Sequence, residues 1–307
     1  MTTPTRQPSL AVVVPATNSP PSLEACVAAL REAAPDAELI VQTEPPGSGP
    51  AAARNAAAAR TDADVLVFVD ADVLVHADAV ERLRDHFRAD PSLAAVFGAY
   101  DDRPAAPGAV SRFRNLLHHH VHVTSAGEAE TFWAGLGAVR RDAFAEAGGF
   151  DAEAFPAPAV EDIELGMRLR ARGGRIVLDP RARGTHLKRW TLADMVRTDF
   201  ARRGLPWARL QLADGGTTRA LNLSWRHRAS ALASVVLAAA ALARRGRLVL
   251  AALAVLAALN ARFYALLWRR GGPSLLAAGV PLHVLHHLTA VAAFATALVS
   301  PRARGGR

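Results

Sequence analysis

Length, composition and charge exclude several classes of protein. At 307 residues the chain can form one large domain or two smaller ones, and 51% of its residues are hydrophobic. The net charge is +8, but Lys188 is the only lysine, so arginine supplies nearly all of the positive charge. We interpret this as compositional bias and expect no nucleic-acid partner. An anionic lipid or a phosphorylated substrate is a simpler explanation of the positive charge. Cys26, the only cysteine, excludes an internal disulfide and a cysteine-based zinc site.

The first two thirds of the chain alternate between apolar runs and helix-forming segments. Residues 1–9 are polar and lack the apolar core of a signal peptide, so we expect the N-terminal part to stay in the cytoplasm. The apolar runs predict strands at 10–14, 38–41, 65–69, 93–98 and 175–178, with helices at 22–33, 51–60 and 77–88 between them. This alternation predicts an α/β fold with a mostly parallel sheet and helices on both faces.

Two carboxylates follow the third predicted strand. Val65 to Val69 is a continuous apolar run, and Asp70 and Asp72 come directly after it, separated by one alanine. Open α/β sheets hold ligands at the carboxyl ends of their strands, where these two side chains can converge. Two carboxylates suit a hard divalent cation that is shared with phosphate oxygens. A solvated acidic turn is an equally good interpretation of these residues alone.

A predicted helix at 110–123 contains four histidines. They are His118, His119, His120 and His122. Only His118 and His122 have the i, i+4 spacing that allows two side chains on one helix face to chelate a metal. The acidic residue of the zinc-protease pattern is missing between them. Structural packing or contacts with an acceptor are therefore favoured over a metal site.

Two later segments carry further candidate residues. Residues 131–139 mix β-forming residues with Gly135 and Gly137, which indicates close approach of the backbone to a ligand or to another element. Residues 160–170 predict a helix with Glu161 and Asp162 in its first turn. Either a functional role or the helix dipole, which favours acids at this position, explains the two carboxylates.

The composition changes after Trp225. No acidic residue occurs from there to the end, and three apolar stretches follow, at 229–243, 248–268 and 275–299. The second and third are long enough to cross a bilayer. The first, at about fifteen residues, is marginal, and either lies in the interface or pairs with the second as a hairpin. Arginine clusters flank every stretch, so the positive-inside rule does not set the topology. We predict a membrane domain at 226–307 with two to three transmembrane helices.

Together, these residues resemble a family 2 glycosyltransferase with the GT-A (nucleotide-diphospho-sugar transferase) fold over residues 10–210. The family's nucleotide loop, the segment before its DXD strand, the DXD motif, the glycine loop, the xED motif and the late histidine all have counterparts in the right order. These counterparts are Pro15-Ala16-Thr17-Asn18, Ala53-Arg54-Asn55, Asp70-Ala71-Asp72, Gly135-Leu136-Gly137, Val160-Glu161-Asp162 and His186. Each is weak alone, but several in order on a matching strand pattern are strong. The apolar C-terminal part resembles membrane-anchored members of the family.

The resemblance implies a catalytic domain at 1–225 that transfers a sugar, with inversion, from a nucleotide-diphosphate sugar to a lipid or glycan acceptor. Asp162 is implied as the catalytic base, and Glu161 as a residue that shapes the acceptor site. Asp72 is implied as a ligand of Mn²⁺ or Mg²⁺, with Asp70 supporting ribose or metal and His186 completing the metal site. The residues implied in donor binding are Pro15, Thr17, Asn18, Glu44, Arg54, Asp70, Gly135, Arg202 and Arg203.

Two segments depart from the family pattern. The second strand in the family usually ends in an Asp-Asp-Gly-Ser type sequence, whereas Glu44 is the acid at that position here, so the nucleotide remains undetermined. The acceptor motif near the membrane often ends in Arg-Trp, and Arg202 to Trp207 matches it only loosely. Arg202 or Arg203 is expected to hold either the diphosphate or lipid headgroups.

Two alternatives keep the fold and change the function. A nucleotidyltransferase-like enzyme needs a glycine-rich phosphate-binding loop with a lysine, and Gly47-Ser48-Gly49 has none. A non-catalytic membrane scaffold is disfavoured because Asp72, Asp162 and His186 are all present. We expect the protein in the cell membrane, multi-pass, with its catalytic domain in the cytoplasm.

Overall fold

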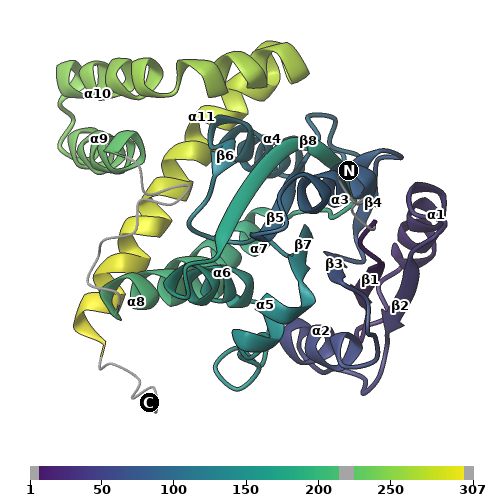
Figure 1. The fold of residues 1–307 in the computed structure, drawn as a ribbon. Coiled ribbons are helices and arrows are strands. Elements are labelled where there is room, and N and C mark those ends of the chain that lie inside the picture. Colours follow the sequence, from purple (N-terminus) through teal and green to yellow (C-terminus); the bar gives the residue numbers. More distant parts are fainter. Residues whose placement is uncertain (1–6, 214–224, 301–307) are drawn as a thin grey trace. The chain divides into compact units, whose positions relative to one another are not determined.

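The computed structural model describes residues 7–213 and 225–300, which fall into two compact units. The sheet unit consists of the chain up to Asp101 together with His122–Lys188, and the helical unit of Asp102–Val121 together with the chain from Arg189 onward. The chain therefore enters and leaves the sheet unit more than once (Figure 1). We describe each unit by itself.

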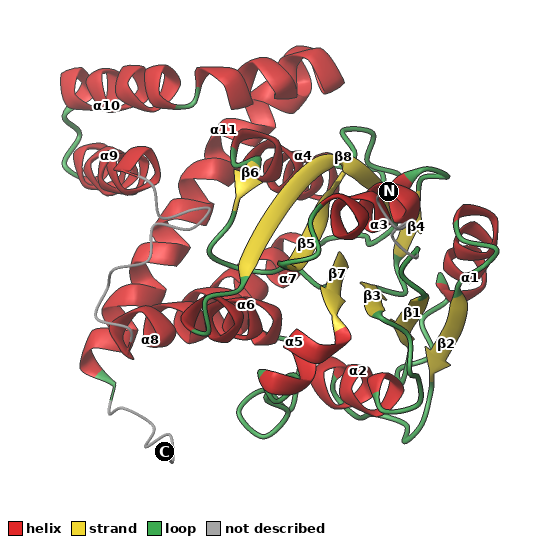
Figure 2. Ribbon diagram, viewed as in Figure 1, coloured by secondary structure: helices red, strands yellow, loops and turns green. Residues whose placement is uncertain are grey.

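One sheet organises the first unit (Figure 2). Its strands lie in the order β2-β1-β3-β7-β5-β8-β4, and β6 pairs with β8 outside this path. The helices that pack against it are α1 (Leu23–Ala33), α2 (Pro50–Ala58), α3 (Ala79–Ala89), α5 (Arg141–Glu146) and α6 (Glu161–Ala171). The strands are β1 (Leu10–Pro15), β2 (Glu38–Gln42), β3 (Val65–Val69), β4 (Val73–Val75), β5 (Leu93–Tyr100), β6 (Gly127–Glu128), β7 (Leu136–Arg140) and β8 (Arg175–His186).

The sheet is mixed, which corrects the prediction of a mostly parallel one. The pairs β1–β2, β1–β3 and β5–β8 are parallel. β7 is antiparallel to both β3 and β5, and β4 and β6 are antiparallel to β8. The alternation of strands and helices in the sequence does not predict the direction of β7, because the connection from β5 runs through Asp102–Val121 of the helical unit. A connection that is not a helix packed back on the sheet leaves the strand direction free.

β3 is the central element of the sheet unit. All five of its residues are buried, as the continuous apolar run predicted. The Phe68 ring lies 5.6 Å from that of Phe144 and 5.2 Å from that of Phe150, measured between centroids. These contacts attach the segment after α5 to the strand. The carboxyl end of β3, where Asp70 and Asp72 follow, is therefore held by packed side chains on a rigid element.

The helical unit contains most of α4 (Ala109–Thr124), α7 (Leu192–Arg197), a π-helix η1 (Thr198–Gly204), α8 (Leu205–Ala213), α9 (Trp225–Leu242), α10 (Gly246–Leu259) and α11 (Ala261–Val299). Its core joins residues distant in sequence: Phe113 and Leu116 of α4 pack with Phe263, Leu267 and Leu275 of α11. Inside α11, Gly272 has a left-handed φ of 65° and interrupts the helical geometry. The helix therefore bends just before Pro273.

α11 is the one helix among residues 7–213 and 225–300 that is long and apolar enough to cross a membrane. The predicted apolar stretch at 248–268 is not a single helix, because Asn260 separates α10 from α11. α10 has 14 residues, too few for a span. One candidate span thus takes the place of the predicted two to three, and further spans are not shown. Residues 302 and 304 of the last arginine cluster lie outside the described part.

Candidate active site

The carboxyl end of β3 brings together acids from two parts of the chain. Asp70 and Asp72 follow the strand, and Glu161 and Asp162 begin α6. The backbone N–H of Asp70 donates to the Gly135 carbonyl at 3.1 Å, which fixes the strand end against the segment before β7. The four acids predicted from the sequence therefore surround one edge of the sheet unit.

Asp72 faces His186 at the end of β8. Asp72 Oδ2 lies 3.5 Å from His186 Nε2, and 31% of the Asp72 side chain is exposed. Burial raises the pKa of Asp72, but the hydrogen bond and charge of His186, together with the charge of Lys188, outweigh burial and hold the pKa below its usual value. Asp72 is thus a partly accessible carboxylate beside an imidazole.

Tyr100 and Trp133 support His186, and the sequence analysis did not identify either of them. The Tyr100 ring stacks on His186 with 4.3 Å between centroids and 9° between planes. Trp133 meets Tyr100 edge-on at 4.8 Å. The position of Tyr100 could have indicated it, because the fourth predicted strand continues two residues beyond its expected end and finishes at Tyr100. A stacked imidazole keeps its orientation, as a ligand or hydrogen-bonding group requires.

The Asp72–His186 pair fits the divalent cation implied by the family resemblance. A carboxylate oxygen and an imidazole nitrogen are both donors that suit Mn²⁺, and the remaining positions would be filled by diphosphate oxygens and water. No group of three or more His, Cys, Asp and Glu side chains in the described residues is arranged to hold a metal. Asp72 and His186 would be two of the ligands, and the contact of Asp70 with the ribose or the metal stays a prediction.

Arg54 of α2 joins two of the acids. Its Nη2 donates to Asp70 Oδ1 at 2.7 Å and its Nη1 to Glu161 Oε1 at 2.9 Å. The side chain is 4% exposed, and its guanidinium lies 5.3 Å from the centroid of the Phe150 ring. Burial raises the pKa of Asp70, and the charge of Arg54 opposes this rise. Both terminal nitrogens of Arg54 therefore donate to carboxylates of the protein.

Glu161 and Asp162 are adjacent but have different surroundings. Glu161 is buried, and its second oxygen accepts a hydrogen bond from the Ala159 N–H at 2.9 Å. Asp162 is half-buried and accepts from the Ala134 N–H at 3.2 Å and from the Ile163 N–H at 2.8 Å. Glu161 is therefore an internal ion-pair partner, whereas Asp162 is the more accessible carboxylate.

The predicted nucleotide loop is tied to the loop after β2. Thr17 Oγ1 donates to the Ser48 carbonyl at 2.5 Å, and the Gly47 N–H donates to the Thr17 carbonyl at 2.9 Å. Asn18 and Glu44 are exposed, and Pro15 ends β1. The contact of Pro15, Thr17, Asn18 and Glu44 with a donor stays a prediction.

Gly135 packs face-on against Trp133. A Cβ built at this glycine would lie 2.4 Å from the Trp133 ring. A Cβ at Gly137 would meet the Trp133 carbonyl at 2.3 Å. The closest contacts of both glycines are with Phe132 and Trp133 of their own segment, so approach to a ligand or to another element stays a prediction.

Several predicted residues lie elsewhere. Arg202 and Arg203 are exposed residues of η1 in the helical unit, so their role in holding a diphosphate or lipid headgroup stays a prediction. In the sheet unit, His122 Nδ1 lies 3.0 Å from the Gly98 carbonyl, and its ring packs against Phe97 and Trp133. Packing of His122 agrees with the favoured reading of the histidine segment.

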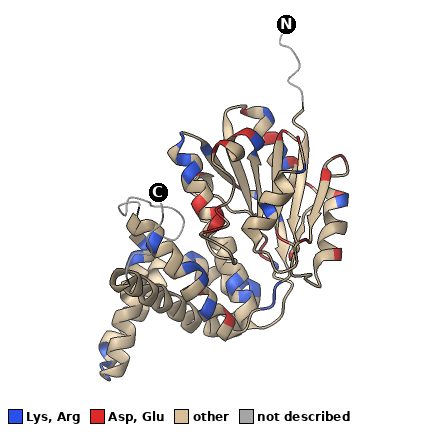
Figure 3. Cartoon of the chain, turned by 90° about the horizontal axis from the view of Figure 1, so that it is seen from below, with Lys and Arg blue, Asp and Glu red and all other residues tan. Residues whose placement is uncertain are grey.

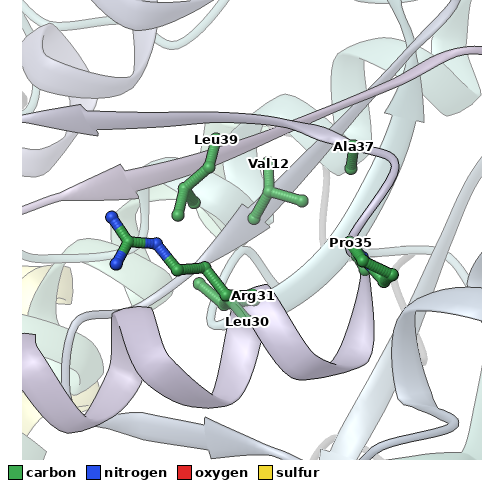
Figure 4. A pocket seen from close by; sticks show the side chains of 7 residues that line it. Val12, Leu30, Arg31, Pro35, Ala37 and Leu39 are labelled. Carbon is green, nitrogen blue, oxygen red and sulfur yellow. The ribbon is translucent and has the colours of Figure 1, made fainter.

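A pocket of about 160 Å³ lies away from these acids, between α1 and the strands β1 and β2 (Figure 4). Val12, Leu30 and Leu39 line it together with Arg31. None of the predicted site residues is in its wall. Its small size and mainly aliphatic wall make it a packing defect beneath α1.

Comparison with known proteins gives the family and the fold. The sequence model of glycosyl transferase family 21 matches residues 17–304. A solved structure of the mannosyltransferase PcManGT from Pyrobaculum calidifontis, in complex with GDP-Man and Mn²⁺, is similar with a TM-score of 0.54 at 19% identity. The match covers 96% of this chain and 88% of that one. The family 2 label drawn from the short motifs is not confirmed.

Another solved structure is similar at a lower score. A structure of GalNAc-T7 with UDP, GalNAc and Mn²⁺ matches with a TM-score of 0.47 at 13% identity, over 75% of this chain and 51% of that one. No curated protein sequence matches the chain.

Proposed function

Because the chain belongs to glycosyl transferase family 21, we propose that it transfers a sugar from a nucleotide-diphosphate donor to a lipid or glycan acceptor at a membrane, with inversion. The observation that carries this proposal is the arrangement around β3. Asp72 and the buried His186 form a carboxylate–imidazole pair whose carboxylate is partly exposed, and Asp162 presents a second, half-buried carboxylate at the start of α6. A donor site and a base on different elements are what an inverting displacement requires.

The donor side of the reaction is assigned to Asp72 and His186. A divalent cation bound there would neutralise the charge that develops on the diphosphate as it leaves. Asp72 would hold this cation with one carboxylate oxygen and His186 with Nε2, and the Tyr100 stack would keep the imidazole in place. Asp70, tied to Arg54, would support the ribose or the cation through its remaining oxygen.

The acceptor side is assigned to Asp162. Its carboxylate would take the proton of the acceptor hydroxyl as that oxygen attacks the anomeric carbon and the bond to the diphosphate breaks. The hydrogen bonds from the Ala134 and Ile163 N–H groups hold the carboxylate in one orientation. Glu161 would act on the acceptor site through its ion pair with Arg54 rather than by contact.

The proposed membrane location rests on α11. Residues 273–299, after the bend at Gly272, are about 40 Å long at 1.5 Å per residue, more than a hydrocarbon core of about 30 Å needs. The exposed positions of this segment include Val291, Phe294 and Leu298, whereas His283 and His287 are buried. Large apolar side chains outside and polar ones inside suit a helix in lipid. We place the sheet unit on the cytoplasmic side.

The test uses the purified full-length protein and a panel of nucleotide-diphosphate sugars. Thermal stabilisation is measured with each donor in the presence of Mn²⁺, Mg²⁺ or a chelator, and hydrolysis or transfer is followed for the donors that stabilise. We expect stabilisation by one donor class, dependent on the cation. A protein that binds a donor without turning it over with any acceptor would be the scaffold alternative. Cleavage within the nucleotide part would indicate the nucleotidyltransferase alternative.

A further inference from the structure

The helices α9 and α10 form an antiparallel hairpin within the helical unit (Figure 1). At its open end, Arg226 Nη2 donates to the Leu259 carbonyl at 2.8 Å, and Asn260 Nδ2 donates to Ser230 Oγ at 2.9 Å. At its closed end, Arg244 has a φ of 55° and the Arg245 N–H donates to the Ala240 carbonyl at 2.8 Å. We call residues 225–260 the hairpin.

The hairpin buries mostly small residues and exposes most of its large ones, although Leu256 of α10 is buried. In α9 the buried residues are Ser230, Ala233, Ser234 and Ala240. Leu232 on the same helix is 65% exposed, and Leu250 on α10 is 69% exposed. The other large apolar residues that the hairpin exposes are Trp225, Val235, Val236, Leu242, Leu248 and Val255.

This distribution is the reverse of a helix that faces water. In water, leucine and valine would occupy the buried stripe, because their burial contributes most to stability. In lipid no hydrophobic effect drives large side chains into the helix contact, so helices approach through small residues while large aliphatic side chains face the acyl chains. The outer surface of the hairpin is therefore suited to hydrocarbon.

The length of the hairpin excludes a crossing of the bilayer. α10 has 14 residues and is about 21 Å long, and the apolar part of α9, residues 229–242, is about as long. A hydrocarbon core of about 30 Å is longer than either. Arg244, Arg245 and Arg247 are exposed at the closed end, and a hairpin inserted with its closed end pointing into the bilayer would place these three charges in hydrocarbon.

Basic residues at both ends match the headgroup region of a membrane. Arg226 and Arg228 are exposed at the open end, and the hairpin contains no acidic residue. Figure 3 shows the long helices mostly in tan with basic positions along them. Because neither helix of the hairpin is long enough to connect the two headgroup layers, arginines at both of its ends can reach phosphate groups only if both ends lie at the same depth.

We propose that the hairpin lies in one leaflet, parallel to the surface, with both ends at the headgroups and its leucine- and valine-rich face in the acyl region of an anionic membrane. The inference rests on the proposed membrane location and deepens it. It assigns the contact with lipid to a second element besides α11. It also combines the two possibilities that the sequence left open for residues 229–243, because α9 pairs with α10 as a hairpin and the proposed hairpin lies in the interface.

The test measures depth in the bilayer at single labelled cysteines in the full-length protein. The background is Cys26→Ala, since the native thiol is the only one and is buried. The environment-sensitive dye NBD is attached at Ala239→Cys in α9, Leu250→Cys in α10, Val291→Cys in α11 and, as a water-exposed control, Ala89→Cys in α3. The protein is reconstituted into vesicles of phosphatidylcholine and phosphatidylglycerol that carry spin-labelled lipids at known depths.

We expect the labels at 239 and 250 to be quenched most strongly by shallow spin labels, about 5–10 Å below the headgroups. Strongest quenching of either label at the bilayer centre would overturn the inference in favour of a membrane-crossing hairpin. Quenching at 291 with none at 239 and 250 would overturn it while leaving the membrane location intact. Absence of quenching at all three positions would remove the membrane location itself. None of these outcomes depends on transferase activity.

A second measurement tests whether the two ends of the hairpin lie on the same side of the membrane. In inside-out and right-side-out vesicles from the expressing bacterium, an impermeant maleimide is applied to Ala243→Cys at the closed end and to Ala261→Cys at the open end, both exposed. We expect the two positions to react in the same preparation. Reaction in opposite preparations would show that the hairpin crosses the membrane and would overturn the inference.

Discussion

Arg54 and Glu161 are 107 residues apart in the sequence and form a buried ion pair, with 2.9 Å between Nη1 and Oε1. Through its second terminal nitrogen the same arginine holds Asp70 at 2.7 Å. The guanidinium thus connects the end of β3 to the start of α6. In the sequence analysis Arg54 was a donor-binding residue; the geometry supports an internal role that positions acids on both sides of the proposed reaction.

We predict that Arg54 and Glu161 are energetically coupled. Arg54→Met leaves Glu161 as an unpaired buried carboxylate and is expected to lower the free energy of unfolding by about 3–5 kcal/mol. Adding Glu161→Gln should recover part of that loss, with a coupling energy of about 1–3 kcal/mol. Thermal and denaturant unfolding of the four proteins measure it. Arg31→Met, at an exposed arginine of α1, is the matched control and should change stability by less than about 0.5 kcal/mol. Additive effects of the two substitutions would contradict the coupling.

We predict that Asp72→Asn abolishes cation-dependent donor binding while the fold is retained. Asp72 is partly exposed, so the isosteric amide leaves no buried charge unpaired and removes only the anionic ligand. Calorimetric titration of a nucleoside diphosphate with Mn²⁺ checks this prediction, and circular dichroism checks the fold. Unchanged affinity would end the assignment of Asp72 as a metal ligand.

We predict that Asp162→Asn lowers turnover by about 10²- to 10⁴-fold, because a general base contributes that much to the rate. Donor affinity should be nearly unchanged. Glu161→Gln should lower turnover less and act more on acceptor KM and on stability, since Glu161 is bound to Arg54. Steady-state kinetics with the identified acceptor separate the two variants. Wild-type turnover in Asp162→Asn would place the base elsewhere.

Asp199 provides a pH-dependent contribution to stability. Burial raises its pKa, but the charges of Arg114 at 2.9 Å and His286 at 2.8 Å outweigh burial and lower the pKa to about 2. A carboxylate with a lowered pKa stabilises the folded state above its unfolded pKa of about 4, and this contribution is lost as the pH falls from about 4 to about 2. The difference in unfolding free energy between the wild type and Asp199→Asn should therefore shrink by about 2 kcal/mol over that range. A constant difference would show that Asp199 titrates normally.

Truncation after Arg226, close to the domain boundary predicted from composition, tests the domain organisation. It removes Phe263, Leu267 and Leu275, against which Phe113 and Leu116 of α4 pack. We expect the shortened chain to expose this apolar face of α4 and to aggregate, as size-exclusion chromatography would show. Removal of residues 301–307 alone is the control and should leave the protein monodisperse in detergent. A soluble, monomeric product after truncation at Arg226 would support an independent catalytic domain at 1–225.

The sequence by itself determined most of the local elements. The run from Val65 to Val69 is β3 as predicted, and the helix predicted at 160–170 is α6, shifted by one residue at each end. Continuous burial and helical periodicity are properties of neighbouring residues, so they can be read without knowing what packs on them. The order of the short motifs also predicted a glycosyltransferase, although the sequence model that matches the chain is that of family 21.

The tertiary structure decided how these elements are joined. An apolar run has the same pattern in either direction, so the sequence did not reveal that β7 is antiparallel to β3. A basic side chain in an alanine-rich helix looks the same whether it meets a donor or two internal acids, so only the fold gave Arg54 its partners. Likewise, an apolar stretch does not show which of its residues face outward. Only packing showed that Ser230 is buried in α9 while Leu232 is exposed, because pairing between distant segments is not recorded in local pattern.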